Sequence, residues 1–239
     1  MSFRRGSAPG PTGLRAEHLR AATQSAPPNR RAKALEAVAR LVNVLSDGDV
    51  PEEVAPYLSG ARLQAGLKKC GGLRPIAVGN LFRRLTSKCQ MFGVAERAGR
   101  LLSPQQLGVG VPGGLEAVIH AINQVVEEGD DQLMILQLDL VNAFNMCDRD
   151  SAFKVVEEFF PDILKWVLTC YGTNALLVFG NTIIMSECGF HQHGATRADI
   201  YLRLDFWNKT NNKYYELQNY KHACVISILS HIWPMDAIN

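Results

Sequence analysis

Long hydrophobic runs are missing from this chain of 239 residues. No segment approaches the roughly 18 consecutive apolar residues that a membrane-spanning helix requires. The opening residues, MSFRRGSAPGPTG, also lack the apolar centre of a secretory signal peptide. The sequence therefore predicts an intracellular protein of the cytoplasm or nucleus, neither secreted nor membrane-bound.

Cysteine pairs with metal-binding spacing are missing as well. The six cysteines include no CxxC pair, which argues against a zinc ribbon and against a disulfide framework and favours reduced thiols. Cys188, His191 and His193 stand close together, but nothing nearby supplies a fourth ligand. We interpret these residues as structural or exposed side chains.

Two short motifs imitate functional sites without the context that such sites need. Gly108, Gly110 and Gly113 spell GxGxxG, yet no predicted strand precedes them as a dinucleotide site requires. The GDD string at 129–131 resembles an acidic metal-binding pair but falls in a polar turn. We therefore assign neither motif a role.

The charge of the chain is unevenly distributed, although the net charge is only +2. Residues 1–110 contain 17 Lys and Arg against 7 Asp and Glu, whereas residues 111–165 contain 3 against 11. This pattern is typical either of solvated helix faces or of a polyanion-binding half beside metal-binding acids. Composition alone leaves both interpretations open.

The hydrophobic pattern predicts an α+β fold with helices packed around small antiparallel sheets. With 47% hydrophobic residues the chain can build a core in one domain or two small ones. The periodicity predicts helices at 10–22 with Thr12 as cap, 29–48, 51–58, 80–102 and 115–128, and one or two helical stretches after the strand at 131–140 through 160–172. In the helix at 115–128 the residues expected to face inward are Leu115, Val118, Ile119, Ile122 and Val125 or Val126. Strands are predicted on either side of Gly71-Gly72 within 61–79, at 131–140, and on either side of Gly180-Asn181 within 175–187.

The strand at 131–140 ends by presenting a single carboxylate. Leu136, Leu138 and Leu140 alternate with Gln137 and Asp139, which places Asp139 near the carboxyl end of the strand. An acid in this position can hold a metal, cap a helix or face water. The residues themselves leave these three roles open.

Five strings in the sequence form one ordered set: GPTGLRAEHL, KKCGGLRPIAVGNLFRRLTSK, QLGVGVPGGLEAVIHAI, LQLDLVNAFNMCDR and SECGFHQ. Their order resembles that found in reverse transcriptases of non-viral, non-LTR-like retroelements. From about residue 10 to about residue 194 the chain resembles the fingers and the first part of the palm of that right-hand polymerase family. The resemblance divides the chain into an N-terminal arm and fingers-like region at 1–131, a partial palm-like region at 132–193 and an unmatched tail at 194–239.

The resemblance implies a site for nucleotidyl transfer, with an RNA template, a DNA primer, deoxynucleotides and Mg²⁺ as ligands. It implies Asp139 as the catalytic and metal-binding acid, with the carbonyl of Leu140 as a further metal ligand. The implied nucleotide-binding residues are Lys68, Lys69 and Arg74 for the triphosphate, Phe144 beneath the sugar, and Gln192 close to the nucleotide. A core aromatic at Phe144 and a solvated hairpin tip for the three cations remain the alternatives.

The sequence departs from the family after Gly194. The proline that should follow Gln192 is lost, and the second acidic motif, a pair of aspartates, is not found in residues 194–239. One carboxylate does not hold two ions in a fixed geometry. We therefore expect a truncated RNA-directed DNA polymerase, its reading frame lost near Gly194, that is inactive by itself. The alternatives are a non-catalytic RNA or RNA–DNA binding module and a structural partner protein.

Overall fold

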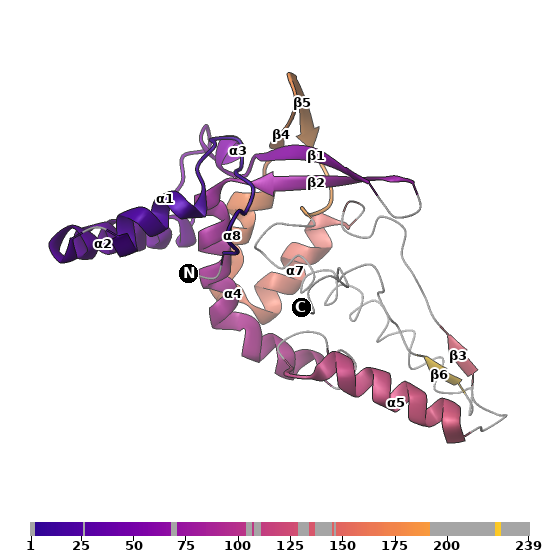
Figure 1. Cartoon of the computed structure of the whole chain (residues 1–239). Helices are drawn as coiled ribbons and strands as arrows, with labels where there is room; N and C mark the ends of the chain where they lie inside the picture. Colours follow the sequence, from indigo (N-terminus) through magenta and orange to yellow (C-terminus); the bar gives the residue numbers. More distant parts are fainter. Residues whose placement is uncertain are drawn as a thin grey trace. The chain divides into compact units, whose positions relative to one another are not determined.

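A computed structural model describes residues 3–25, 27–67, 71–103, 107, 111–128, 134–136, 145, 147–191 and 223–225 (Figure 1). The contacts divide the chain into two compact units. One unit comprises Met1–Gly93 and Phe144–Ala198, and the other comprises Val94–Ala143 and Asp199–Asn239. The described residues form seven α-helices and a four-stranded mixed sheet, which confirms the α+β class.

The first unit is rich in helices. They are α1 (Ala16–Arg20), the π-helix η1 (Ala21–Ser25), α2 (Pro28–Ser46), α3 (Ala55–Leu58), α4 (Leu81–Leu102, which continues into the second unit), α7 (Arg149–Phe159) and α8 (Pro161–Tyr171). The predicted cap of α4 is confirmed, because the side-chain oxygen of Asn80 accepts a hydrogen bond from the Phe82 amide at 3.1 Å. The predicted end of α2 is confirmed too, since Asp47 is its C-cap residue and Gly48 follows with φ +70°.

Two of these helices begin later than the sequence predicted. The first was expected from residue 10 with Thr12 as its cap, but α1 begins at Ala16. Gly13 has φ +74°, a conformation that interrupts a right-handed helix. Pro51 likewise does not begin α3, because a turn precedes the helical residues, which start at Ala55.

Two β-hairpins form the sheet, as the turn residues predicted. Strands β1 (Ala61–Leu67) and β2 (Leu73–Gly79) pair antiparallel over seven registered positions, and β4 (Ala175–Phe179) and β5 (Thr182–Ser186) pair over five. Gly180 has φ +59° in the second turn, a conformation that glycine tolerates best. Both hairpins are therefore determined by short-range sequence.

The prediction of purely antiparallel sheets is wrong. The strand order is β2-β1-β4-β5, and β1 pairs parallel with β4 through Ala61–Leu177 and Arg62–Val178. Parallel neighbours need a long crossover connection. The chain between β2 and β4 provides one, because it contains helices α4, α7 and α8.

Helix α8 supplies much of the core of the first unit. Ile163, Trp166, Val167 and Cys170 recur at helical spacing and are all nearly inaccessible to solvent. The indole N–H of Trp166 donates a hydrogen bond to the Ser87 hydroxyl at 3.0 Å. Trp166 is thus fully buried, and its polar N–H group still has a hydrogen-bond partner where α8 contacts α4.

The described part of the second unit contains the end of α4, helix α5 (Gly114–Glu128) and two short parallel strands, β3 (Met134–Leu136) and β6 (Ala223–Val225). The predicted strand at 131–140 is confirmed over 134–136. The inward orientation expected for α5 is wrong at Leu115 and Ile119, which are 51% and 56% exposed. An amphipathic period identifies an apolar face, but it does not identify what covers that face.

Across the described ranges, each helix is either too short or too polar to cross a bilayer.

Candidate functional site

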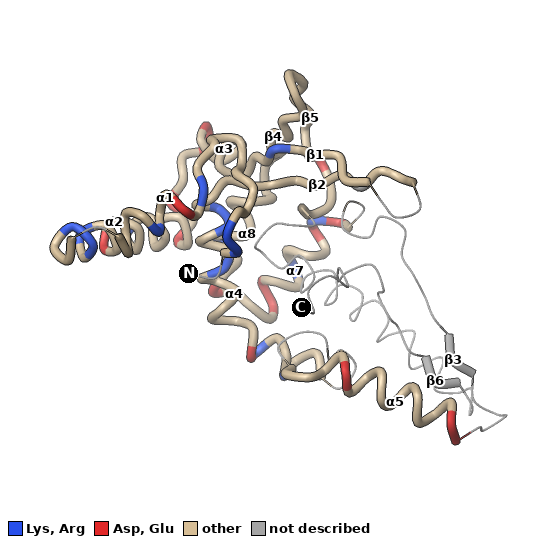
Figure 2. The backbone as a smooth tube through the Cα atoms, viewed as in Figure 1, with Lys and Arg blue, Asp and Glu red and all other residues tan. Residues whose placement is uncertain are grey.

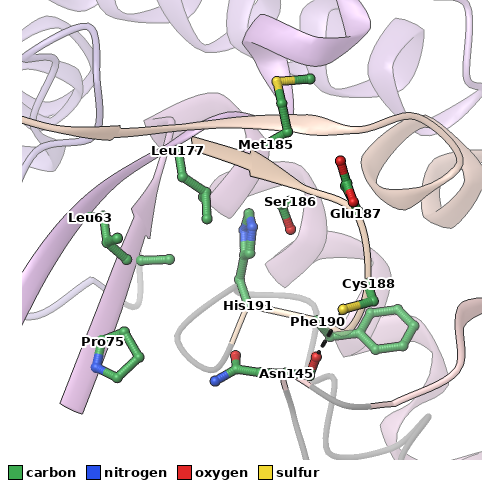
Figure 3. A pocket seen from close by; sticks show the side chains of 11 residues that line it. Leu63, Pro75, Asn145, Leu177, Met185, Ser186, Glu187, Cys188, Phe190 and His191 are labelled. Atoms are coloured by element: carbon green, nitrogen blue, oxygen red, sulfur yellow. Dashed lines mark hydrogen bonds between the residues drawn. The ribbon is translucent and has the colours of Figure 1, made fainter. Parts of the chain in front are cut away.

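A pocket with a volume of about 250 Å³ opens between the two hairpins of the first unit. Its walls come from both hairpins and from the segment that follows β5 (Figure 3). The lining residues are Leu63, Pro75, Ala77, Asn145, Leu177, Met185, Ser186, Glu187, Cys188, Phe190 and His191. The volume is slightly below the range for small-molecule sites, which begins at roughly 300 Å³.

The segment Glu187–His191 lies directly on the backbone at Asn145. The Cys188 thiol donates a hydrogen bond to the Asn145 carbonyl at 3.4 Å, drawn as a dashed line in Figure 3. Gly189 has φ +66°, and a Cβ atom placed on it would lie 2.4 Å from the carbonyl carbon of Asn145. Only glycine allows the two backbones to approach this closely.

Arg149, at the start of α7, fixes the segment Glu187–His191 through hydrogen bonds. Its guanidinium donates hydrogen bonds to the carbonyls of Gly189 at 2.9 Å, Ser186 at 3.0 Å, and Cys188 and Tyr171 at 3.3 Å. It also donates to the Ser186 hydroxyl at 3.0 Å. Burial lowers the pKa of Arg149, but a guanidinium remains charged in proteins. One planar group with several donors thereby orders the wall of the pocket.

Arg83 in α4 fixes the orientation of His191. A guanidinium nitrogen of Arg83 lies 2.9 Å from Nδ1 of His191 and also donates to the Ser59 carbonyl. Since arginine can only donate, Nδ1 must accept, and the single proton of the neutral imidazole is on Nε2. Burial first, and then the charges of Arg83 and Arg149, hold the pKa of His191 well below its usual range. His191 is therefore neutral at physiological pH.

The ring of Tyr171 lies close to both buried cations. The guanidinium carbon of Arg83 is 4.9 Å from the centre of the tyrosine ring, and that of Arg149 is 5.7 Å from it. Both distances are within the range of cation–π attraction. Among the described residues no carboxylate pairs with either arginine, and the negative ring face partly offsets the cost of burying the two positive charges.

The structure describes only one of the residues that the resemblance implied for the site, and only as backbone. Arg74 lies in β2, opposite Gly66 in the hairpin register. The others lie outside the described residues: Lys68, Lys69, Asp139, Leu140, Phe144 and Gln192. Their predicted roles stay predictions.

Three of the predicted nucleotide-binding residues are nevertheless covalent neighbours of residues that line the pocket. Arg74 precedes Pro75, Phe144 precedes Asn145, and Gln192 follows His191. The pocket therefore brings Pro75, Asn145 and His191 together, although they are far apart in sequence.

The predicted magnesium ligands, Asp139 and Leu140, lie outside the described residues. Within the described ranges, no three His, Cys, Asp or Glu side chains come together as a metal site. Cys188 and His191 both line the pocket, but Nδ1 of His191 faces the Arg83 guanidinium.

Sequence reasoning missed the two buried arginines. A signal was present in the helical period, because Arg149 stands on the same face of α7 as Ala152 and Val156, which are buried. Arg83 similarly stands one turn before the buried Thr86 and Ser87. A cation on the apolar face of a helix indicates a buried polar cluster, but not its partners.

No protein-family model and no curated protein matches the chain.

Proposed function

We propose that the chain is the nucleotide-binding part of a reverse-transcriptase-like polymerase, with fingers and an incomplete palm, and that the pocket is its nucleotide site. The observation that carries this proposal is the position of Pro75, Asn145 and His191 around one pocket. Each is the chain neighbour of a residue to which the resemblance gives a nucleotide contact. The chain is proposed to bind deoxynucleoside triphosphates without joining them.

The β1–β2 hairpin is the part proposed to hold the triphosphate. Its seven registered pairs fix the backbone of Arg74 beside a pocket-lining residue. A guanidinium offers paired donors that match phosphate oxygens. Lys68 and Lys69 belong to the connection between the two strands and would add positive charge there.

The proposal excludes polymerisation by these 239 residues because the second acidic motif is not found in the sequence after Gly194. Mg²⁺ bound at Asp139 and the Leu140 carbonyl would neutralise phosphate charge. Activation of a primer hydroxyl requires a second ion and further carboxylates. In a primer-extension assay with an RNA template, magnesium and deoxynucleotides, the purified chain is expected to make no product.

Replacement of Arg74 by alanine tests the proposed site. The R74A variant is expected to bind deoxynucleoside triphosphates about 10-fold or more weakly, because charge-assisted hydrogen bonds to phosphate are lost. Isothermal titration calorimetry measures the change.

The control for this measurement is R40A. Arg40 is exposed on α2, and no residue of that helix lines the pocket. Its removal takes away the same charge and should leave the affinity unchanged. Equal affinities of R74A and the unmodified chain, or equal losses in R74A and R40A, would refute a specific triphosphate contact.

A second candidate function is a non-catalytic RNA or RNA–DNA binding module. Basic residues gather along α2 and at the start of α4 (Figure 2). Four of them are Arg30, Arg31, Lys33 and Arg40, and Glu36 is the single acid within α2. Binding through phosphates weakens steeply with added salt. Affinity for RNA that does not change between low and moderate salt would remove this candidate.

A third candidate is a structural partner protein. Strand β5 is an edge of the sheet, and its side chains Ile183, Ile184 and Met185 are exposed. Exposed apolar edges are sites where another chain can pair. A stable oligomer in sedimentation experiments, with no affinity for nucleotides or nucleic acid, would favour this candidate over the other two.

A further inference from the structure

One buried polar atom in the pocket has no hydrogen-bond partner among the described residues. It is Nε2 of His191, a residue only 6% exposed. In Figure 3 the imidazole lies near the middle of the pocket, between Leu63 and Leu177 on one side and Ser186 and Cys188 on the other. A buried polar atom without a partner costs free energy and calls for an explanation.

The chemistry of this atom follows from its other neighbour. Arg83 occupies Nδ1 as a donor, so Nε2 carries the proton and can only donate. Arg83 and Arg149 also disfavour a second proton on the ring. The pocket therefore presents one fixed N–H group, and the ligand group that complements it is an acceptor.

The walls around this donor favour an uncharged group. Leu63, Pro75, Leu177 and Met185 contribute apolar surface. The one acidic side chain in the lining, Glu187, would repel a phosphate. The cavity thus suits a sugar or a base better than a triphosphate.

We propose that the Nε2–H group of His191 donates a hydrogen bond to an oxygen or ring-nitrogen acceptor on the nucleoside portion of the nucleotide. This inference rests on the proposed function and assigns a different part of the same ligand to a different residue. Arg74 binds the phosphates from the β1–β2 hairpin, and His191 binds the nucleoside inside the pocket. His191 is a binding residue and takes no part in chemistry.

Two substitutions at His191 separate the donor from the rest of the ring. In H191N the amide oxygen can still accept from Arg83, but no donor reaches the position of Nε2. In H191Q the longer amide places an N–H group close to that position. The H191N variant is expected to bind both the four deoxynucleosides and their triphosphates about 3- to 10-fold more weakly. The H191Q variant is expected to restore most of the affinity.

The comparison with R74A distinguishes this inference from the proposed function. R74A should weaken binding of the triphosphates and leave binding of the deoxynucleosides unchanged, whereas H191N should weaken both by the same factor. If R74A weakens triphosphate binding and H191N changes nothing, the inference is overturned and the proposed function stands. If H191N acts and R74A does not, the inference stands and the triphosphate site is misplaced. Absence of binding by the unmodified chain overturns both.

A spectroscopic measurement keeps the test independent of variant stability. The ¹⁵N resonance and the attached proton of His191 Nε2 are followed by NMR in the unmodified chain as a deoxynucleoside is added. A new hydrogen bond is expected to shift the proton downfield and to slow its exchange with water. A resonance that stays unchanged at saturating deoxynucleoside overturns the inference.

Discussion

Replacement of Arg149 by methionine is expected to lower the free energy of unfolding by about 3–5 kcal/mol. The side chain donates to four carbonyls and one hydroxyl in and around the segment after β5. Each buried acceptor that loses its donor costs about 1–3 kcal/mol, and water can reach only some of them. Urea denaturation followed by circular dichroism measures the loss.

Two control variants make the Arg149 result specific. Lys154 is exposed on the same helix, and K154M is expected to change the free energy of unfolding by less than about 0.5 kcal/mol. R149K keeps the charge but lacks the planar fork, so it should lose more than half of the stability that R149M loses. An R149M variant as stable as K154M would contradict the role assigned to Arg149.

Replacement of Gly189 by alanine is expected to lower the free energy of unfolding by about 3 kcal/mol. A residue with a Cβ atom is strained at φ +66°, and that atom would lie 2.4 Å from the Asn145 backbone. The left-handed conformation costs about 1–2 kcal/mol and the steric conflict about 1–3 kcal/mol. The same denaturation measurement gives the difference.

Gly180 provides the matched control for this steric conflict. Its φ of +59° is nearly the same, but an added Cβ would meet nothing within 4 Å. G180A should therefore lose only the conformational part, about 1 kcal/mol. If G189A and G180A lose equal stability, the close approach of the two backbones is not the constraint that we describe.

Much of the local structure could be predicted from the sequence because its signals are short-range. Gly71 and Gly180 both have positive φ and stand between apolar runs, and each marks a hairpin that forms. Asn80 caps α4, and Asp47-Gly48 ends α2, as these residue types favour. Within these segments the residue that decides the conformation is next to the residues that adopt it.

The packing between the hairpins could not be predicted in the same way. The parallel contact of β1 with β4 joins residues more than 110 positions apart, and no local pattern encodes it. The exposed face of α5 shows the same limit, since periodicity fixes a face and not its partner. For the candidate site, the roles given to Arg74 and Gln192 from the sequence stay predictions, whereas the cluster of Arg83, Arg149 and His191 required the fold.

Assignment of the pocket as a nucleotide site is the central claim, and NMR mapping of a bound deoxynucleoside triphosphate tests it most directly. Backbone amide resonances of the unmodified chain are recorded during a titration without metal, which removes any dependence on Asp139. The account predicts the largest shifts at Ala77, Leu177 and Ser186–His191, which line the pocket, and at Arg74 beside it. Shifts confined to α2, or no shifts at saturating nucleotide, would contradict it.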